Sequence, residues 1–289
     1  MSIPSMQSTI RALSFSFAAT LLLMPISQAQ GMSGGRQATP GGPSTDMQQT
    51  ELHVLTDVQR QPGVTIDAKE QKAYDAFFRA SLADPDKKIQ LGNAFLEKYP
   101  NSVFAEAVDS QLTTAYYDKQ DWKDFYATAD KALTLKPDDV DVLASVGWVI
   151  PHFYNPHDEN ADQQLNKAET YEKHAIEVMA TLKKPASLTD AQFAAAKVQT
   201  ANQAHSALGL VYFRREDYAN SATELQQVMQ NNPTPDQTDL FVLGMDLQSL
   251  DKFADAADAF GRCGQIAGNL QDRCKQNADL ARKQAAQPK

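Results

Sequence analysis

Histidines and neighbouring acidic residues are the side chains of this 289-residue chain best suited to hold a metal. His152 and His157 lie in the segment PHFYNPHDEN, together with Asp158 and Glu159. Imidazole and carboxylate groups ligate Zn²⁺. The segment has neither the HExxH spacing nor a cysteine that would complete such a site. The alternative interpretation is that Asp158 and Asn160 cap the helix that follows.

The two cysteines, Cys263 and Cys274, are too far apart in sequence for a CxxC redox pair. Gly268 lies about midway between them and marks the expected turn between two helices. A helical hairpin would bring the two thiols face to face. In an exported chain we expect a disulfide, worth about 3 kcal/mol in the chain-entropy account. Two free buried thiols are the alternative.

Other signals of catalysis are absent from the sequence. It has no GxSxG motif, no phosphate-binding loop and no pair of CxxC motifs. His174 and His205 fall within expected helices and are interpreted as partly packed side chains. We therefore predict that the protein is not an enzyme and has no metal or cofactor.

Helices must position all of these residues, and residues 202–233 show the pattern most clearly. Leu208, Val211 and Tyr212 recur at i, i+3 and i+4, which places them on one face of a helix. Gly209 has no side chain, so a second helix can approach closely there. Neither helix of such a pair can bury its apolar stripe alone.

A polar break separates the two helices of this pair. Residues 214–217 (RRED) are too charged to be buried, and we expect them to form the turn. A second stripe follows with Tyr218, Leu225 and Val228. Pro233 ends the second helix because proline lacks the backbone N–H.

On these residues, Leu208-Gly209, Tyr212, Tyr218 and Pro233, the chain resembles the tetratricopeptide repeat (TPR) family, in its exported bacterial type. The resemblance implies an all-α fold, a right-handed solenoid of helical hairpins with a C-terminal capping helix. It also implies a role in binding proteins or peptides.

Similar units precede and follow this one, so the helical repeat domain is predicted to span 67–289. Pro85 is expected to stop the first helix. The third unit departs from the pattern, because Pro151 opens a longer loop in place of the usual short turn. A long helix is expected from about 190 to 214, and a polar capping helix at about 269–286.

The resemblance places first-helix side chains along a concave groove. Apolar and aromatic groups at a concave surface suit partner binding. The predicted partner-binding residues are Tyr117, Trp148, His152, Leu210, Phe213, Phe241 and Met245. The alternative is that neighbouring helices, or residues 51–66, cover them.

The first 66 residues divide into three predicted segments. Residues 1–29 are a signal peptide, with Arg11 ahead of an apolar run and Ser27-Gln28-Ala29 at the cleavage site. An uncleaved anchor is the alternative. Residues 30–50 are a disordered linker, rich in Gly, Pro and Ser. Residues 51–66 form a strap that is either a loose helix or extended.

The formal charge of −9 argues against a nucleic-acid partner and against binding to an anionic membrane surface. The mature chain has no expected membrane span, and the signal peptide predicts a periplasmic or secreted protein. We expect an exported adaptor or scaffold with a protein or peptide partner. The alternative is a structural subunit of a larger envelope complex that uses its convex face and ends.

Overall fold

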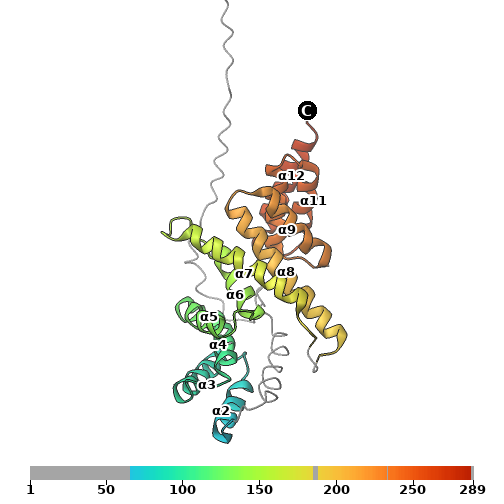
Figure 1. The fold of residues 1–289 in the computed structure, drawn as a ribbon. Helices are drawn as coiled ribbons and strands as arrows, with labels where there is room; N and C mark the ends of the chain where they lie inside the picture. The colour runs from blue at the N-terminus through green and yellow to red at the C-terminus, as the bar shows by residue number, and fades with distance from the viewer. Residues whose placement is uncertain (1–65, 185–187, 233, 288–289) are drawn as a thin grey trace, which may run out of the picture. The chain divides into compact units, whose positions relative to one another are not determined.

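The computed structural model describes three stretches, residues 66–184, 188–232 and 234–287. The predicted signal peptide, the linker and all of the strap except Ile66 lie outside the described residues. Within the described stretches every regular element is an α-helix (Figure 1). This confirms the predicted all-α class.

The helices carry the labels of Figure 1. Their bounds are α2 Ala68–Phe78, α3 Pro85–Lys98, α4 Ala105–Lys119, α5 Trp122–Leu135, α6 Val140–His152, α7 Ala161–Thr181, α8 Asp190–Arg214, α9 Tyr218–Asn231, α10 Gln237–Ser249, α11 Phe253–Cys263 and α12 Gln271–Ala285.

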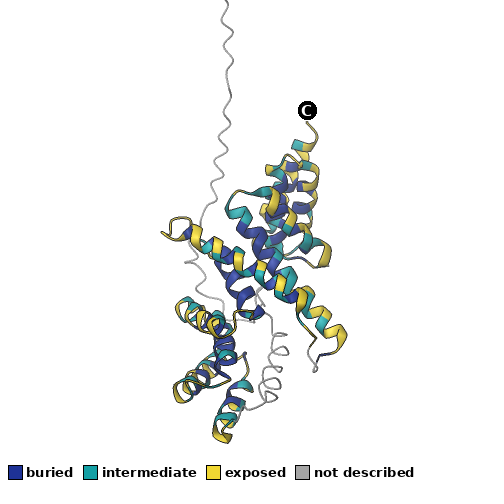
Figure 2. Ribbon diagram, viewed as in Figure 1, coloured by how far each residue is buried: buried dark blue, intermediate teal, exposed yellow. Residues whose placement is uncertain are grey.

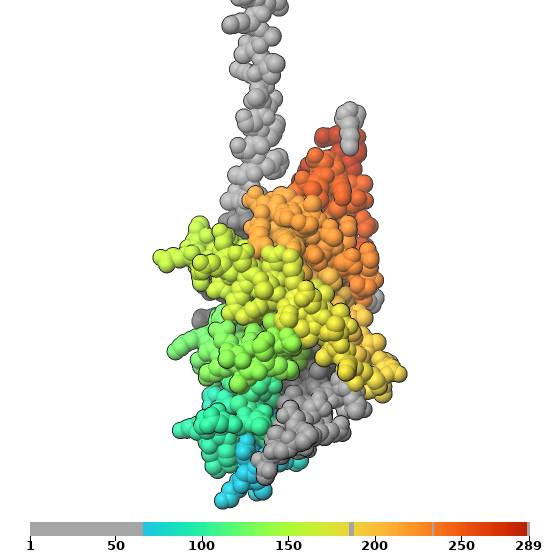
Figure 3. Space-filling view, viewed as in Figure 1, coloured from blue at the N-terminus to red at the C-terminus, as the bar shows by residue number. Residues whose placement is uncertain are grey.

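The helices pack as successive antiparallel pairs, so the described chain is a TPR-like stack of hairpins. α4 packs on α5, α6 on α7, α8 on α9 and α10 on α11, and α12 closes the last pair against α11. Helices α4, α6, α8, α10 and α12 also contact one another in succession, and we call them the inner layer. The pairs follow one another in chain order in the space-filling view (Figure 3).

Side-chain caps explain where most of these helices begin. The capping residues that accept a backbone N–H are Asp67, Asp84, Asp121, Asp139, Thr189, Asp217 and Asp236. Each satisfies an N–H that its helix leaves unpaired, worth about 1 kcal/mol. Thr189 forms a reciprocal capping box with Gln192, which confirms the predicted start of the long helix α8.

The turns inside three of the pairs share one backbone conformation. Gln120, Glu216 and Asp251 have φ of 56°, 60° and 57°, in the left-handed region. Each stands between the first and second helix of its pair. The α6–α7 connection is longer and lacks such a residue, in agreement with the predicted departure of the third unit.

Close contact at Gly209 holds α8 against α9, as the sequence predicts. A Cβ at residue 209 would come within 2.6 Å of Leu225 Cγ. Real Cβ atoms do not approach that closely, so only glycine fits without a shift of the neighbouring helix.

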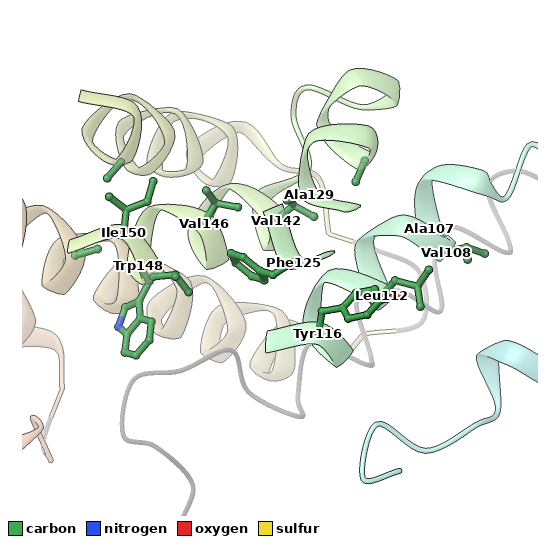
Figure 4. Packing of buried hydrophobic residues seen from close by; sticks show 14 of the residues in the cluster. Ala107, Val108, Leu112, Tyr116, Phe125, Ala129, Val142, Val146, Trp148 and Ile150 are labelled. Carbon is green, nitrogen blue, oxygen red and sulfur yellow. The ribbon is translucent and has the colours of Figure 1, made fainter. Parts of the chain in front are cut away.

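The buried side chains form two large clusters that meet on α8. The first extends from α2 to Val211 on α8. Its members Phe125 and Val146 are labelled in Figure 4. The second extends from α8 to α12 and includes Leu210 and Phe260. Buried residues lie where the helices face one another, and exposed residues lie on their outer sides (Figure 2).

One lysine belongs to this interior. Lys88 on α3 is 1% exposed, and its Nζ donates to the carbonyl oxygens of Phe77, Phe78 and Ala80 at 3.1, 3.3 and 3.3 Å. These carbonyls lie at the C-terminal end of α2, where an ammonium group is favoured by the helix dipole. Lys88 therefore holds α2 on α3.

Two prolines differ from their predicted roles. Pro85 does not stop α2, which already ends at Phe78; it is the first residue of α3, where its missing N–H has no helical partner to lose. Pro151 does not open a loop, because α6 continues to His152. Pro151 lies in the last turn of α6, and the helix ends one residue after it.

The predicted caps of α7 are also wrong. Asn160 precedes α7 but its side chain accepts no capping hydrogen bond. Asp158 instead accepts from Asn155 Nδ2 at 2.7 Å, within the loop.

At the C-terminus, Cys263 and Cys274 form a disulfide, with a Cα–Cα distance of 5.6 Å. The bond joins the end of α11 to the first turn of α12, on either side of the turn at Gly268. Among the described residues, no helix combines the length and the apolarity needed to cross a bilayer.

Candidate partner-binding surface

The seven predicted partner-binding residues all lie on the inner layer, but they differ in exposure. Two of them are buried, Trp148 at 5% exposed and Leu210 at 7%. The other five are half-buried: Tyr117 on α4, His152 on α6, Phe213 on α8, and Phe241 and Met245 on α10. The surface that a partner could contact is therefore smaller than the predicted set.

Trp148 is the centre of an aromatic group rather than a free contact. It leaves α6 on the side away from Val146 and Ile150 (Figure 4). Its ring meets Tyr117 edge-on, with centroids 6.0 Å apart, and stacks on His152 at 3.7 Å. Trp148 thus positions the half-buried Tyr117 and His152.

The aromatic group continues to the end of α6. Trp122 meets Tyr117 at 6.0 Å and Phe153 at 4.6 Å between ring centroids. The side chain of Phe153, directly after α6, is 45% exposed. Trp122 is the first residue of α5 and Phe153 directly follows α6, so this aromatic group joins two helical pairs.

His152 is neutral at ordinary pH. Burial, together with the charge of Arg214, lowers the pKa of His152 to about 4, against the opposing effect of a hydrogen bond to the Trp148 carbonyl. His152 Nδ1 lies 2.6 Å from that carbonyl oxygen, so Nδ1 carries the proton. His152 is therefore a flat aromatic surface here and not a cation.

Two consecutive arginines at the end of α8 were expected in an exposed turn, and this expectation is wrong. Both are half-buried. Arg215 binds Glu169 and Asn166 on α7 through its two terminal nitrogens. Charged side chains can lie here because their aliphatic stems pack while their ends find partners.

Arg214 faces the other way, toward the end of α6. Its Nε donates to the Pro151 carbonyl oxygen at 3.3 Å, and its guanidinium carbon lies 5.8 Å from the ring centroid of Tyr154. Burial lowers the pKa of Arg214, and Tyr154 partly offsets this effect. In the described part of the chain no carboxylate lies within ion-pair distance of Arg214.

On α10, the half-buried residues border the second cluster. Phe241 meets Phe260 edge-on, with centroids 5.8 Å apart, and Arg273 on α12 lies over its ring at 5.2 Å. Phe213 on α8 meets Tyr218 at 6.1 Å. The apolar residues of α8 and α10 thus present part of each side chain to solvent while the rest is packed.

The loop after α6 does not assemble a metal site. His157, Asp158 and Glu159 are exposed, and Asp158 accepts a hydrogen bond from Asn155 within the same loop. Across residues 66–184, 188–232 and 234–287, no group of three or more His, Cys, Asp or Glu side chains is arranged to hold a metal ion.

The two helical histidines are partly packed, as predicted, and each contacts a carboxylate. His174 Nε2 lies 2.7 Å from Asp138 Oδ1, and His205 Nδ1 lies 2.7 Å from Glu224 Oε2. Both pairs join side chains from different parts of the stack. The sequence did not indicate these partners, because they are 36 and 19 residues away.

The sequence analysis did not indicate that the carboxylic acids of Glu172 and Asp246 are buried. Glu172 on α7 is fully buried against Gly147, where a Cβ would come within 2.5 Å of Glu172 Oε1. Neither carboxyl oxygen of Glu172 has a hydrogen-bond partner in the described part of the chain. Burial raises the pKa of Glu172 well above its ordinary value.

Asp246 on α10 is a second such acid. Its Oδ2 lies 2.5 Å from Ser221 Oγ, which also lies 2.8 Å from the carbonyl oxygen of Gly209. A hydroxyl has one proton and a carbonyl oxygen can only accept, so Asp246 supplies the second proton as a neutral acid. Burial raises the pKa of Asp246 to about 8, against the lowering effect of Ser221.

No family model matches this chain, and no curated protein matches it. Among solved structures, the chain is similar to the crystal structure of a thermophilic TPR protein from Thermus thermophilus, at 14% sequence identity and a TM-score of 0.45. The similarity covers 74% of this chain and 99% of that chain. A likeness at this level of identity concerns the fold alone.

Proposed function

We propose that this protein is an exported adaptor that binds a protein or peptide along its inner layer. The observation that carries the proposal is the series of half-buried side chains on successive inner helices, Tyr117, His152, Phe213, Phe241 and Met245. Aromatic and methionine side chains give large contact area when a partner covers them. Stacked helical pairs present such side chains along an extended surface.

Export is supported by two features. The first 29 residues have the charged, apolar and small-residue segments of a signal peptide, and they lie outside the described residues. The Cys263–Cys274 disulfide suits an oxidising compartment such as the periplasm or the cell exterior. The adaptor would act there without a cofactor, and we propose no enzymatic activity.

The second candidate is a structural subunit of a larger envelope complex. A pocket of about 540 Å³ between α11 and α12 favours it, lined by Ala254, Ala257, Asp258, Arg282, Ala285 and Ala286. Short side chains at the end of a helical stack allow another helix to approach closely. A subunit of this kind would bind through its end and its outer helices.

A capture experiment distinguishes the two candidate functions. Residues 30–289, purified with the disulfide formed, would be used to capture proteins from an envelope extract. The test variant is Phe213→Ala with Met245→Ala, since both side chains are half-buried, whereas Trp148→Ala would open a cavity in the aromatic group. The matched control is Leu135→Ala, because Leu135 is 57% exposed on the outer helix α5.

An adaptor should lose a specific captured protein in the inner-layer variant and keep it in the Leu135→Ala control. Far-UV circular dichroism should show that both variants keep their helices. A capture that survives the inner-layer variant would contradict the adaptor proposal. It would favour the structural subunit if substitutions at the α11–α12 pocket then abolished it.

A further inference from the structure

Helices α4, α6 and α8 of the inner layer are buried on every side. Their runs of consecutive buried residues are 107–113, 142–151 and 206–211. An α-helix has 3.6 residues per turn, so each of these runs passes through all sides of its helix. The outer helices α5, α7, α9 and α11 instead have an exposed residue in every turn. The side of the inner layer that faces away from the outer helices is therefore covered.

The described helices cover α4 and α6 only from behind and from the flanks. On α4 these are the outer helices α3 and α5 and the inner helix α6. Ser110 shares the remaining side with Tyr117, two turns further along α4, and it is 7% exposed. The remaining side of α6 includes Ala144 and Trp148, which are also buried. We call this the inner side.

One buried polar side chain next to the inner side has no partner among the described residues. Gln111, directly after Ser110, is 1% exposed, and neither its amide oxygen nor its amide nitrogen has a hydrogen-bond partner there. Buried amides are normally hydrogen-bonded. A further segment that brings peptide groups to α4 would supply the missing partners.

The strap, residues 51–66, leads directly to this surface. Its last residue, Ile66, packs against the first cluster of buried side chains and lies just before the cap of α2. The strap carries Leu52, Val54, Leu55 and Val58 close together. Burial of such side chains against the alanine and tryptophan on the inner side of α6 is favourable.

We propose that the strap binds along the inner side of α4 and α6 within the same molecule and covers Trp148. The stretch from Val58 to Ile66 can span up to about 26 Å. Packed helices lie about 10 Å apart, so this length is enough to pass two helices. Attachment to the fold gives the strap an effective concentration of about millimolar, so a modest affinity suffices.

A docked strap would compete with a partner for part of the proposed binding surface. It would cover the half-buried Tyr117 and His152 around Trp148, and leave Phe241 and Met245 on α10 open. A partner that binds the whole surface would first displace the strap. The docking does not depend on the adaptor proposal, whereas this competition rests on it.

Two double variants of oxidised residues 30–289 test the docking. The test variant, Leu52→Asp with Leu55→Asp, places charge at apolar positions of the strap. The control variant, His53→Asp with Gln61→Asp, adds two aspartates at polar positions of the same segment. All four positions lie outside the described helices, so far-UV circular dichroism and the melting temperature should match those of the parent protein.

Fluorescence of Trp148 reports whether the inner side is covered. The substitution Trp122→Phe, made in every protein, leaves Trp148 as the single tryptophan. Acrylamide should quench Trp148 about twofold more strongly in the test variant than in the control, because the ring becomes open to solvent. A synthetic peptide of residues 51–65, added at saturation, should restore the low quenching, and a scrambled peptide should not.

Direct binding of the peptide gives the second readout. By fluorescence anisotropy, the fluorescein-labelled peptide should bind the test variant about tenfold more tightly than the control, whose own strap occupies the site. Equal quenching in the two variants would overturn the inference, as would equal binding of the peptide. A rise in quenching that the peptide does not reverse would also overturn it, since it would report a loosened fold.

Neither readout uses an envelope partner. The adaptor proposal can therefore fail in the capture experiment while the docking of the strap is confirmed, and the docking can fail while the adaptor proposal stands. Capture with the same two variants then measures the competition. The test variant should capture more partner than the control, and equal capture would refute the competition alone.

Discussion

Replacing Asp246 by asparagine should stabilise the protein at neutral pH. Asp246 is fully buried on α10, and its pKa is about 8 in the fold, compared with 3.8 for an ordinary aspartate. The folded state holds a proton at pH 7 that the unfolded chain has released. Folding must therefore take up this proton, and Asp246→Asn removes that requirement.

The size of the stabilisation by Asp246→Asn follows from the shift in the pKa of Asp246. One pKa unit corresponds to about 1.4 kcal/mol, and pH 7 lies about three units above the ordinary value, so the maximum gain is about 4 kcal/mol. The asparagine amide can donate to Ser221 Oγ in place of the acid proton, which keeps the contact to α9. We expect a measured gain of about 1–4 kcal/mol, since local relaxation lowers the cost in the wild-type protein.

The pH dependence gives a sharper test than the gain itself. A group whose folded pKa is raised contributes its full stability below the unfolded pKa and loses it as the pH rises through the folded pKa. The advantage of Asp246→Asn should therefore be near zero at about pH 4 and grow up to about pH 8. Urea unfolding followed by far-UV circular dichroism measures it.

Asp258→Asn is the control, because Asp258 is exposed on α11 and should leave the pH dependence unchanged. A variant less stable than wild type at pH 7, with the same pH dependence, would refute the reasoning. That result would mean that Asp246 is ionised in the fold and that its charge has a favourable partner.

Three further predictions concern other contacts between neighbouring helices. Glu172→Met should raise the free energy of unfolding at pH 7 by about 1–3 kcal/mol, because it removes a buried acid that has no hydrogen-bond partner among the described residues. Urea unfolding would contradict this if the variant were less stable. Gly209→Ala should cost about 1–3 kcal/mol, because its Cβ meets Leu225, whereas Gly261→Ala should stabilise α11 by about 0.5–1 kcal/mol, since only Arg282 lies near, at 3.6 Å. Thermal melting compares these two variants, and equal shifts would argue against the close contact at Gly209. Reducing the disulfide should cost about 3 kcal/mol, and an unchanged melting temperature in reductant would contradict a stabilising role.

Local signals in the sequence predicted most of the fold. The long helix α8 begins at Asp190, as expected, and the close approach of α9 follows from the missing side chain of Gly209. Both depend on residues within a few positions of each other or on a repeated pattern. The disulfide could be anticipated for the same reason, because a single turn separates its cysteines.

The binding surface was harder to predict, because exposure on the inner layer depends on contacts between different pairs. Helical periodicity places Trp148 and Leu210 on the inner side of their helices but does not show how closely the neighbouring inner helices approach. Arg214 and Arg215 show the same limit. Consecutive charged residues suggest a solvated turn, yet one binds α7 and the other reaches α6, over sequence distances of 46 and 63 residues.

Buried acids could not be predicted from the sequence at all. Glu172 stands in a helix among other polar residues, and only its position opposite Gly147 places it in the interior. Apolar residues at helical spacing show which positions of a helix face the core. They do not indicate which polar residue fills the space left by a glycine on the opposite helix.

Lys88 makes the docking of α2 observable by chemical labelling. Its amine is enclosed by the carbonyls at the end of α2, while the neighbouring Lys87 is exposed. A brief treatment with acetic anhydride should therefore modify Lys87 in the native protein and leave Lys88 unmodified. Acetylation of Lys88, read by mass spectrometry, would report each opening of α2 from α3, and partners or conditions that loosen the first hairpin could be ranked by that rate.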